Sequence, residues 1–141
     1  NFDLESSHVL PAMIRKYLYA KQSGAAVQLW GTGTPRREFL HVDDLSDAVW
    51  FTLSHYNAFD NDLLNVGTGT DITIKELSSI MASQTDFQGQ TEWDSSKPDG
   101  TPVKRLDISR MSQAGWSASI GLEDGIKSTI DWYQENHHIN A

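Results

Sequence analysis

The chain has 141 residues, of which 38% are hydrophobic and 10% aromatic, and its formal net charge at pH 7 is −8. This length and composition fit one globular domain with a real core, and no apolar run approaches the roughly twenty residues that a membrane span requires. The negative charge argues against general nucleic-acid binding, and the lack of cysteine excludes a disulfide scaffold and a thiolate metal site.

The first third of the chain predicts a helix followed by two short strands. Ser7 is expected to cap the helix, and Gly24 is expected to end it. A strand is predicted over residues 27–30, a turn over residues 31–35 and a second strand over residues 38–42.

The middle of the chain predicts a helix and a third strand. Asp43 is expected to cap this helix, and Asp44 and Asp47 lie near its positive end. The apolar residues of the helix share one face: Leu45, Ala48, Val49, Leu53 and Tyr56. A strand is then predicted over residues 63–66, closed by a glycine-rich turn.

The last half predicts three helices and a long loop. Thr73 with Glu76 forms a capping box, and the buried stripe of that helix contains Ile74, Leu77 and Met81. A short strand over 91–93 precedes a loop over 94–103, whose two prolines and glycine exclude a helix or a central strand. A short helix over 109–115 and a last helix follow, the latter marked by Leu122, Ile126, Ile130 and Tyr133. The sequence thus predicts a small α/β domain with short strands and about four main helices.

Several patterns that suggest chemistry have simpler explanations. Tyr17 and Lys21 have the spacing of a dehydrogenase pair, but Tyr17 lies on the apolar stripe of its helix, which favours core packing. Two Gly-x-Gly pairs, Gly31 with Gly33 and Gly67 with Gly69, lack the third glycine of a dinucleotide fingerprint and indicate turns. Three aspartates are explained by a helix start, so no metal site is predicted: Asp43, Asp44 and Asp47.

Two histidines and three basic clusters remain as candidates. His41 alternates with apolar neighbours and is expected to be structural, whereas His8 lies at a helix start where its imidazole can point outward. A surface histidine without function is the alternative for His8. On an acidic chain an anionic ligand needs local basic residues, which occur in three places: Arg15–Lys16, Arg36–Arg37, and Lys97 with Lys104 and Arg105.

Two segments give the sequence its clearest functional signal. Residues 30–44 join the indole of Trp30, a tight turn and paired arginines to a helix start, a combination that suits a phosphorylated nucleotide. The second segment, residues 96–102, reads Ser-Lys-Pro-Asp-Gly-Thr-Pro. Together with Ser-His-Val-Leu-Pro-Ala at 7–12 and Asn-Val-Gly-Thr-Gly at 65–69, they closely resemble the GDP-L-fucose synthase family of the extended short-chain dehydrogenases/reductases.

This resemblance covers essentially the whole chain, and it implies a C-terminal substrate-binding domain over residues 1–141. The family epimerises C3 and C5 of GDP-4-keto-6-deoxy-D-mannose and then reduces the C4 ketone with NADPH. Its N-terminal Rossmann domain binds NADP and carries the serine, tyrosine, lysine and cysteine of the active site, none of which matches a position here. We therefore expect this chain alone to be inactive.

The resemblance also assigns site residues by matching position. It implies that His8 is the acid partner of the missing cysteine and lies close to the nicotinamide of NADP. It places four residues in contact with the GDP-sugar: Lys16, Trp30, Arg37 and Asp99. Lys16 stands where some members have arginine, so a bidentate phosphate contact is not expected there.

Other expectations concern the cell and the whole protein. The absence of cysteine fits a reducing compartment, and a cytoplasmic protein without nucleic-acid or membrane partners is expected. Asn1 is not expected to be the natural start, and the full-length protein is expected to be a homodimer while the fragment is monomeric. The alternatives are the same domain of another nucleotide-sugar epimerase or dehydratase, or a free-standing, non-catalytic nucleotide-sugar binding module.

Overall fold

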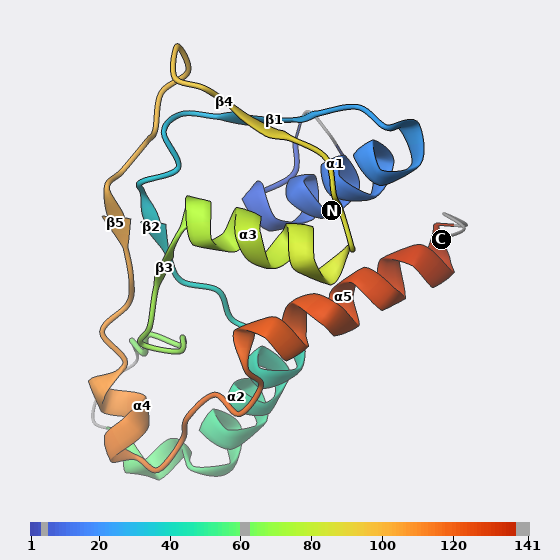
Figure 1. The fold of residues 1–141 in the computed structure, drawn as a ribbon. Helices are drawn as coiled ribbons and strands as arrows, with labels where there is room; N and C mark the ends of the chain where they lie inside the picture. Colours follow the sequence, from blue (N-terminus) through green and yellow to red (C-terminus); the bar gives the residue numbers. More distant parts are fainter. Residues whose placement is uncertain (4–5, 60–62, 138–141) are drawn as a thin grey trace.

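The structure is a computed structural model that describes residues 1–3, 6–59 and 63–137. Helix α3 lies between α1 and α5 (Figure 1). The four long helices have the bounds α1 Val9–Ser23, α2 Val42–Ser54, α3 Ile74–Gln84 and α5 Leu122–Asn136. The shorter ones are α4, Ser109–Gln113, and a single 3-10 turn, η1, Tyr56–Ala58. The prediction of a small α/β domain with about four main helices is confirmed.

The strands form two small sheets. In the first, β1, Val27–Trp30, runs parallel to β4, Thr91–Asp94, and Trp30 pairs with Asp94. In the second, β2 is the central strand, antiparallel to β3 and parallel to β5. These three strands have two residues each: β2 Arg36–Arg37, β3 Ile72–Thr73 and β5 Val103–Lys104. The second sheet therefore brings the middle of the 30–44 segment beside the end of the 94–103 loop.

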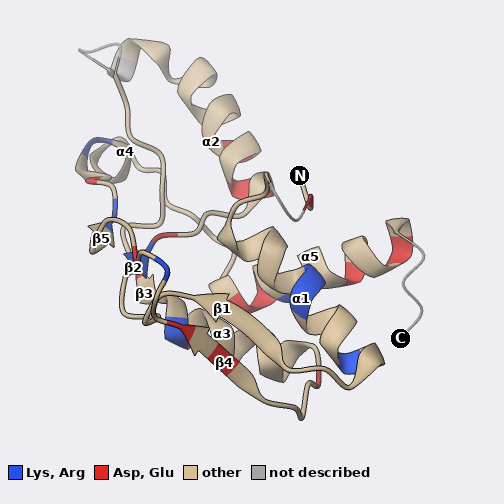
Figure 2. Cartoon of the chain, turned by 90° about the horizontal axis from the view of Figure 1, so that it is seen from above, with Lys and Arg blue, Asp and Glu red and all other residues tan. Residues whose placement is uncertain are grey.

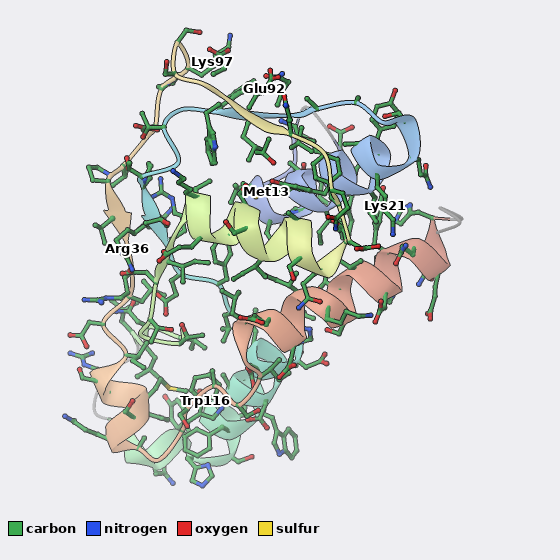
Figure 3. The ribbon with its side chains drawn as sticks, in the orientation of Figure 1. Met13, Lys21, Arg36, Glu92, Lys97 and Trp116 are labelled. Carbon is green, nitrogen blue, oxygen red and sulfur yellow. The ribbon has the colours of Figure 1, made fainter. Side chains whose placement is uncertain are left out.

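The main core lies between α1, α3, α5 and β1. Met13 points from α1 toward α3 (Figure 3), and both Leu77 and Met81 of the predicted stripe are fully buried. Tyr17 is buried as well, and its hydroxyl lies 2.7 Å from the Ser78 hydroxyl and 3.0 Å from that of Thr91. Core packing of Tyr17 is thus confirmed. A second, smaller cluster around Ala48, Met111 and Trp116 packs α2 against α4.

Two of the three predicted N-caps are wrong by one or two residues. His8, not Ser7, is the N-cap of α1, and it makes no side-chain capping hydrogen bond. His41, not Asp43, caps α2, because its Nδ1 accepts the Asp43 N–H at 3.2 Å. This supports the structural role expected for His41. The capping box of Thr73 and Glu76 is confirmed in both of its hydrogen bonds.

Two predicted strands are absent from the described residues. Residues 38–41 are irregular. Glu38 still donates its N–H to the Lys104 carbonyl of β5, but Phe39 then packs on the main core and Leu40 on the second cluster, so the pairing goes no further. Residues 63–66 are also irregular, and their apolar side chains Leu64 and Val66 pack on the second cluster. The apolar patterns of both segments thus reflect packing between clusters and not strand pairing.

The apolar face of α2 is exposed over most of its length. Only Ala48 of the predicted face is fully buried. Six large side chains on α2 and the turn after it are between 46% and 71% exposed: Val42, Leu45, Val49, Trp50, Leu53 and Tyr56. Such a contiguous apolar surface is unusual on a soluble monomer. None of the helices described by the structure has the length and apolar character needed to cross a lipid bilayer.

Asp44 fastens the start of α2 to the segment before α5. Its carboxylate accepts hydrogen bonds from the N–H groups of Ser119 and Ile120, each at 3.0 Å, and from the Ser119 hydroxyl at 2.9 Å. Burial acts to raise the pKa of Asp44, but the hydrogen bonds from Ser119 and Ile120 outweigh it and hold the pKa below its ordinary value. The ionised form is therefore the one that the folded chain stabilises.

Asp44→Asn is expected to destabilise the chain by about 2 kcal/mol at pH 7. One carboxylate oxygen, which accepts a backbone N–H group, would be replaced by an NH2 group that is itself a donor. Because the folded pKa is lowered, the contribution is fully present above the unfolded pKa of about 3.9 and disappears as the pH falls through the folded value. Urea unfolding followed by tryptophan fluorescence at several pH values measures this difference. Asp43→Asn, at an exposed carboxylate, is the matched control. The prediction would be contradicted if Asp43→Asn lost as much stability, or if the stability difference between the wild type and Asp44→Asn stayed the same in acid.

Candidate functional site

The turn after β1 is shaped by glycines and fastened by Asp99. Gly31 and Gly33 have φ values of +77° and +76°, a region that side chains rarely adopt. A Cβ atom at Gly31 would overlap the Asp99 carboxylate. That carboxylate accepts the Thr32 N–H at 2.6 Å and the Thr32 hydroxyl at 2.8 Å. The two segments identified from the sequence therefore meet directly at this turn.

Further contacts hold the same loop against the turn. The Arg37 Nη1 donates to the Thr101 carbonyl at 2.6 Å, and the Lys97 ammonium lies 5.6 Å from the centre of the Trp30 ring. Trp30 is nevertheless 67% exposed, so most of its indole is open to a ligand. Lys97 lies near the tip of the loop (Figure 3).

Arg37 keeps hydrogen-bond donors free. Among the described residues, both hydrogen bonds of its side chain are made by Nη1, to the carbonyls of Arg36 and Thr101. The donors of Nη2 and Nε remain available, and a guanidinium can present such a pair to phosphate in a bidentate manner. Arg36 differs, because it pairs with the buried carboxylate of Asp71 and belongs to the structural network.

A cavity of about 420 Å³ contains Arg37 together with His8. Its other basic residue is Lys104, which β5 places in register with Arg37 of β2. Blue segments gather around β2 and β5 (Figure 2), so this part of an acidic chain is locally basic. His8 is exposed at the cavity, and α1 starts with the next residue. We call this space the His8–Arg37 cavity.

A second cavity of about 250 Å³ contains Lys16 and Trp30. Val9 lines both cavities, so the two spaces adjoin. The Lys16 ammonium donates to the Gln28 carbonyl at 2.8 Å, and burial lowers the pKa of Lys16. Ser7 lines the same cavity, and its hydroxyl oxygen is buried without a hydrogen-bond partner among the described residues. This cavity therefore combines apolar side chains with the ammonium of Lys16.

The structure thus brings four of the five predicted site residues to two adjoining cavities. Asp99 is the exception: it lines neither of these cavities, and its carboxylate accepts hydrogen bonds from Thr32. Lys104 and Ser7 also line these cavities and were not predicted as site residues. Lys104 belongs to a basic stretch visible in the sequence, but its register beside Arg37 follows from a two-residue strand that no periodic pattern marks. Within the described ranges, no group of three histidine or acidic side chains could hold a metal ion.

Comparisons with known proteins show which family the chain resembles. Residues 1–67 match the model of the NAD dependent epimerase/dehydratase family. The chain is 52% identical over 137 residues to "Probable GDP-L-fucose synthase 1" of Oryza sativa subsp. japonica, covering 96% of this chain and 41% of that protein. It is 44% identical to the GDP-L-fucose synthase of Escherichia coli strain K12, covering 96% of this chain and 45% of the relative.

A solved structure gives the same result in three dimensions. The GDP-L-fucose synthetase from Naegleria fowleri bound to NADP superposes with a TM-score of 0.88 at 27% identity, covering 98% of this chain and 43% of that one. The chain therefore spans less than half the length of the relatives it matches. This share is consistent with the C-terminal portion that the resemblance implied, and the predicted resemblance itself is confirmed.

Proposed function

Because this chain is homologous to the GDP-L-fucose synthases, we propose that residues 1–141 are the substrate-binding domain of such an enzyme. The full-length protein would epimerise C3 and C5 of GDP-4-keto-6-deoxy-D-mannose and then reduce the C4 ketone with NADPH. The observation that carries the proposal is the His8–Arg37 cavity, which joins a histidine to two cations of one sheet. Epimerising a nucleotide-sugar requires an acid/base group at the sugar carbons that lose protons and an anion site for the diphosphate.

The proposed substrate contacts follow the two cavities. Arg37 and Lys104 would hold the diphosphate, because Arg37 has free donors and Lys104 lies in register beside it. Trp30 offers an exposed flat ring, and Lys16 adds a cation in the adjoining cavity. Each carboxylate oxygen of Asp99 accepts one hydrogen bond from Thr32, so the remaining lone pairs could accept hydrogen bonds from donors of the sugar or the guanine.

We further propose that His8 moves a proton at the sugar carbons. A C4 ketone makes the protons at C3 and C5 acidic, so an imidazole and a second group could exchange them on opposite faces. His8 is exposed and carries no capping hydrogen bond, which leaves its ring free for this task and for a place beside the nicotinamide. NADPH, held mainly by the rest of the protein, would supply the hydride.

The exposed apolar face of α2 supports the proposal that this chain is one domain of a larger protein. Its six large side chains would be covered by another domain of the same polypeptide, which is where we place the cofactor site and the remaining catalytic groups. In this proposal the full-length enzyme is a cytoplasmic homodimer that pairs mainly through that other domain, whereas the isolated chain is a monomer.

The test compares the full-length protein with the isolated chain. With GDP-4-keto-6-deoxy-D-mannose, the full-length protein is expected to oxidise NADPH, and the 141-residue chain is expected to show no turnover because hydride transfer needs a cofactor positioned against the ketone. Measurable NADPH oxidation by the chain alone would contradict this. A full-length protein that prefers UDP- or dTDP-sugars would indicate another nucleotide-sugar enzyme, and binding without any turnover would indicate a non-catalytic module.

A further inference from the structure

Glu38 joins two distant segments through their backbone. Its Oε1 accepts the N–H groups of Thr68 and Gly69 at 2.6 and 2.7 Å, and its Oε2 accepts the Leu106 N–H at 2.7 Å. The two segments lie 30 and 68 residues further along the chain. A half-buried carboxylate that receives three backbone donors is well satisfied as an anion, and it fixes the relative position of both segments.

The segments that Glu38 joins are walls of the His8–Arg37 cavity. Gly67 and Leu106 line that cavity, as does Glu38 itself. A Cβ atom at Gly67 would overlap the Glu38 carboxylate, so the glycine turn packs directly against it. Among the described residues, only Glu38 accepts backbone N–H groups from both of these walls with the two oxygens of one carboxylate.

Glu38 is also close to the two cations along the backbone. It follows Arg37 in the chain, and its own N–H donates to the Lys104 carbonyl at 3.3 Å. Lys104 is two residues before Leu106, whose N–H the carboxylate holds. Among the described side chains, Glu38 makes no ion pair with either cation, so its charge serves the backbone donors and leaves Arg37 and Lys104 to a ligand.

We propose that Glu38 is a positioning residue for the anion site. Through the Thr68–Gly69 turn and the Leu106 segment, it holds Arg37 and Lys104 at the spacing that the diphosphate of a nucleotide-sugar requires. This inference rests on the proposed function, and it assigns Glu38 no contact with the reacting atoms. His8 is carried by α1, which Glu38 does not hold, so the chemical step should depend on Glu38 much less than substrate affinity does.

The test uses Glu38→Gln and Glu38→Asp in the full-length protein. The amide presents a donor to backbone donors, and aspartate keeps the charge but is one methylene too short to reach both walls. Both variants are expected to raise the KM for GDP-4-keto-6-deoxy-D-mannose about tenfold, and to change kcat by less than about threefold, because a displaced wall weakens binding before it affects proton transfer. Calorimetric titration with GDP should show the same loss of affinity.

Asp44→Asn provides the matched control, because Asp44 also accepts two backbone N–H groups but lies outside the His8–Arg37 cavity. Its KM is expected to stay within about twofold of the wild-type value at a comparable loss of stability. An equal rise of KM in Asp44→Asn, or an unchanged KM in both Glu38 variants, would overturn the positioning role. If Glu38→Gln fails to fold, Glu38→Asp decides. Failure of the wild-type protein to bind GDP would instead refute the proposed function.

Discussion

Replacing His8 by alanine in the full-length protein is expected to lower kcat by about 100- to 10,000-fold, the usual contribution of a positioned acid or base. The dissociation constant of the nucleotide-sugar should change by less than about threefold, because proton transfer assists mainly the transition state. The structure indicates that this substitution should have little effect on folding. His8 caps α1 without a side-chain hydrogen bond, so its removal should cost the helix little.

Isotope exchange gives a second readout for His8. With the wild-type protein in D2O, deuterium is expected to enter the sugar at C3 and C5, and His8→Ala should slow this incorporation along with turnover. His55→Ala is a suitable control, since His55 is an exposed histidine at the far end of α2, stacked on Phe51. An unchanged rate in His8→Ala would return His8 to the role of an ordinary surface histidine.

The parts of the fold that were predicted correctly are those governed by local chemistry. The capping box of Thr73 and Glu76 needs only a hydroxyl and a carboxylate three residues apart, and Gly24 ends α1 with a left-handed φ of +70°. In the predicted stripe of α3, Leu77 and Met81 are fully buried, and Ile74 is partly buried against the same core. These features depend on neighbours within one or two turns, so the sequence contains all that determines them.

The parts that were missed depend on distant partners. A two-residue strand such as β5 has no period, and only its pairing with β2 places Lys104 beside Arg37. Asp44 and Glu38 look like ordinary acidic residues in a helix start and a strand, whereas each holds backbone donors more than 25 residues away. His41 took the capping position expected of Asp43 because an imidazole nitrogen can accept the same N–H.

The candidate site was found largely through the family resemblance. Periodicity alone leaves His8 as a surface histidine and gives no reason to connect Lys16 with Trp30. The structure supplies that connection through one cavity, and it joins His8 to Arg37 through another. For Asp99 it adds a contact that the sequence did not suggest, since the carboxylate organises the Thr32 turn. Direct contact of Asp99 with the substrate stays a prediction.

Arg37→Ala is expected to weaken GDP binding by the full-length protein about 30- to 100-fold, since hydrogen bonds to charged groups contribute about 1.5–3 kcal/mol and the guanidinium would make a bidentate pair. It should also loosen the 94–103 loop, because the contact of Nη1 with the Thr101 carbonyl is lost. Arg37→Lys separates the two effects of charge and geometry. It keeps a point charge in the cavity but loses the fork, so we expect an intermediate loss of about tenfold.

The neighbouring arginine is the control that makes this result specific to the cavity. Arg36→Ala removes the same charge one residue away, but Arg36 is engaged with Asp71, whose carboxylate Arg105 also approaches at 3.5 Å. Its replacement should lower stability and leave GDP affinity within about threefold. If both arginine variants lose affinity equally, the effect is one of net charge alone, and Arg37 has no specific role. If Arg37→Ala alone loses affinity and the loss shrinks at high salt, an exposed ionic contact with the diphosphate accounts for it.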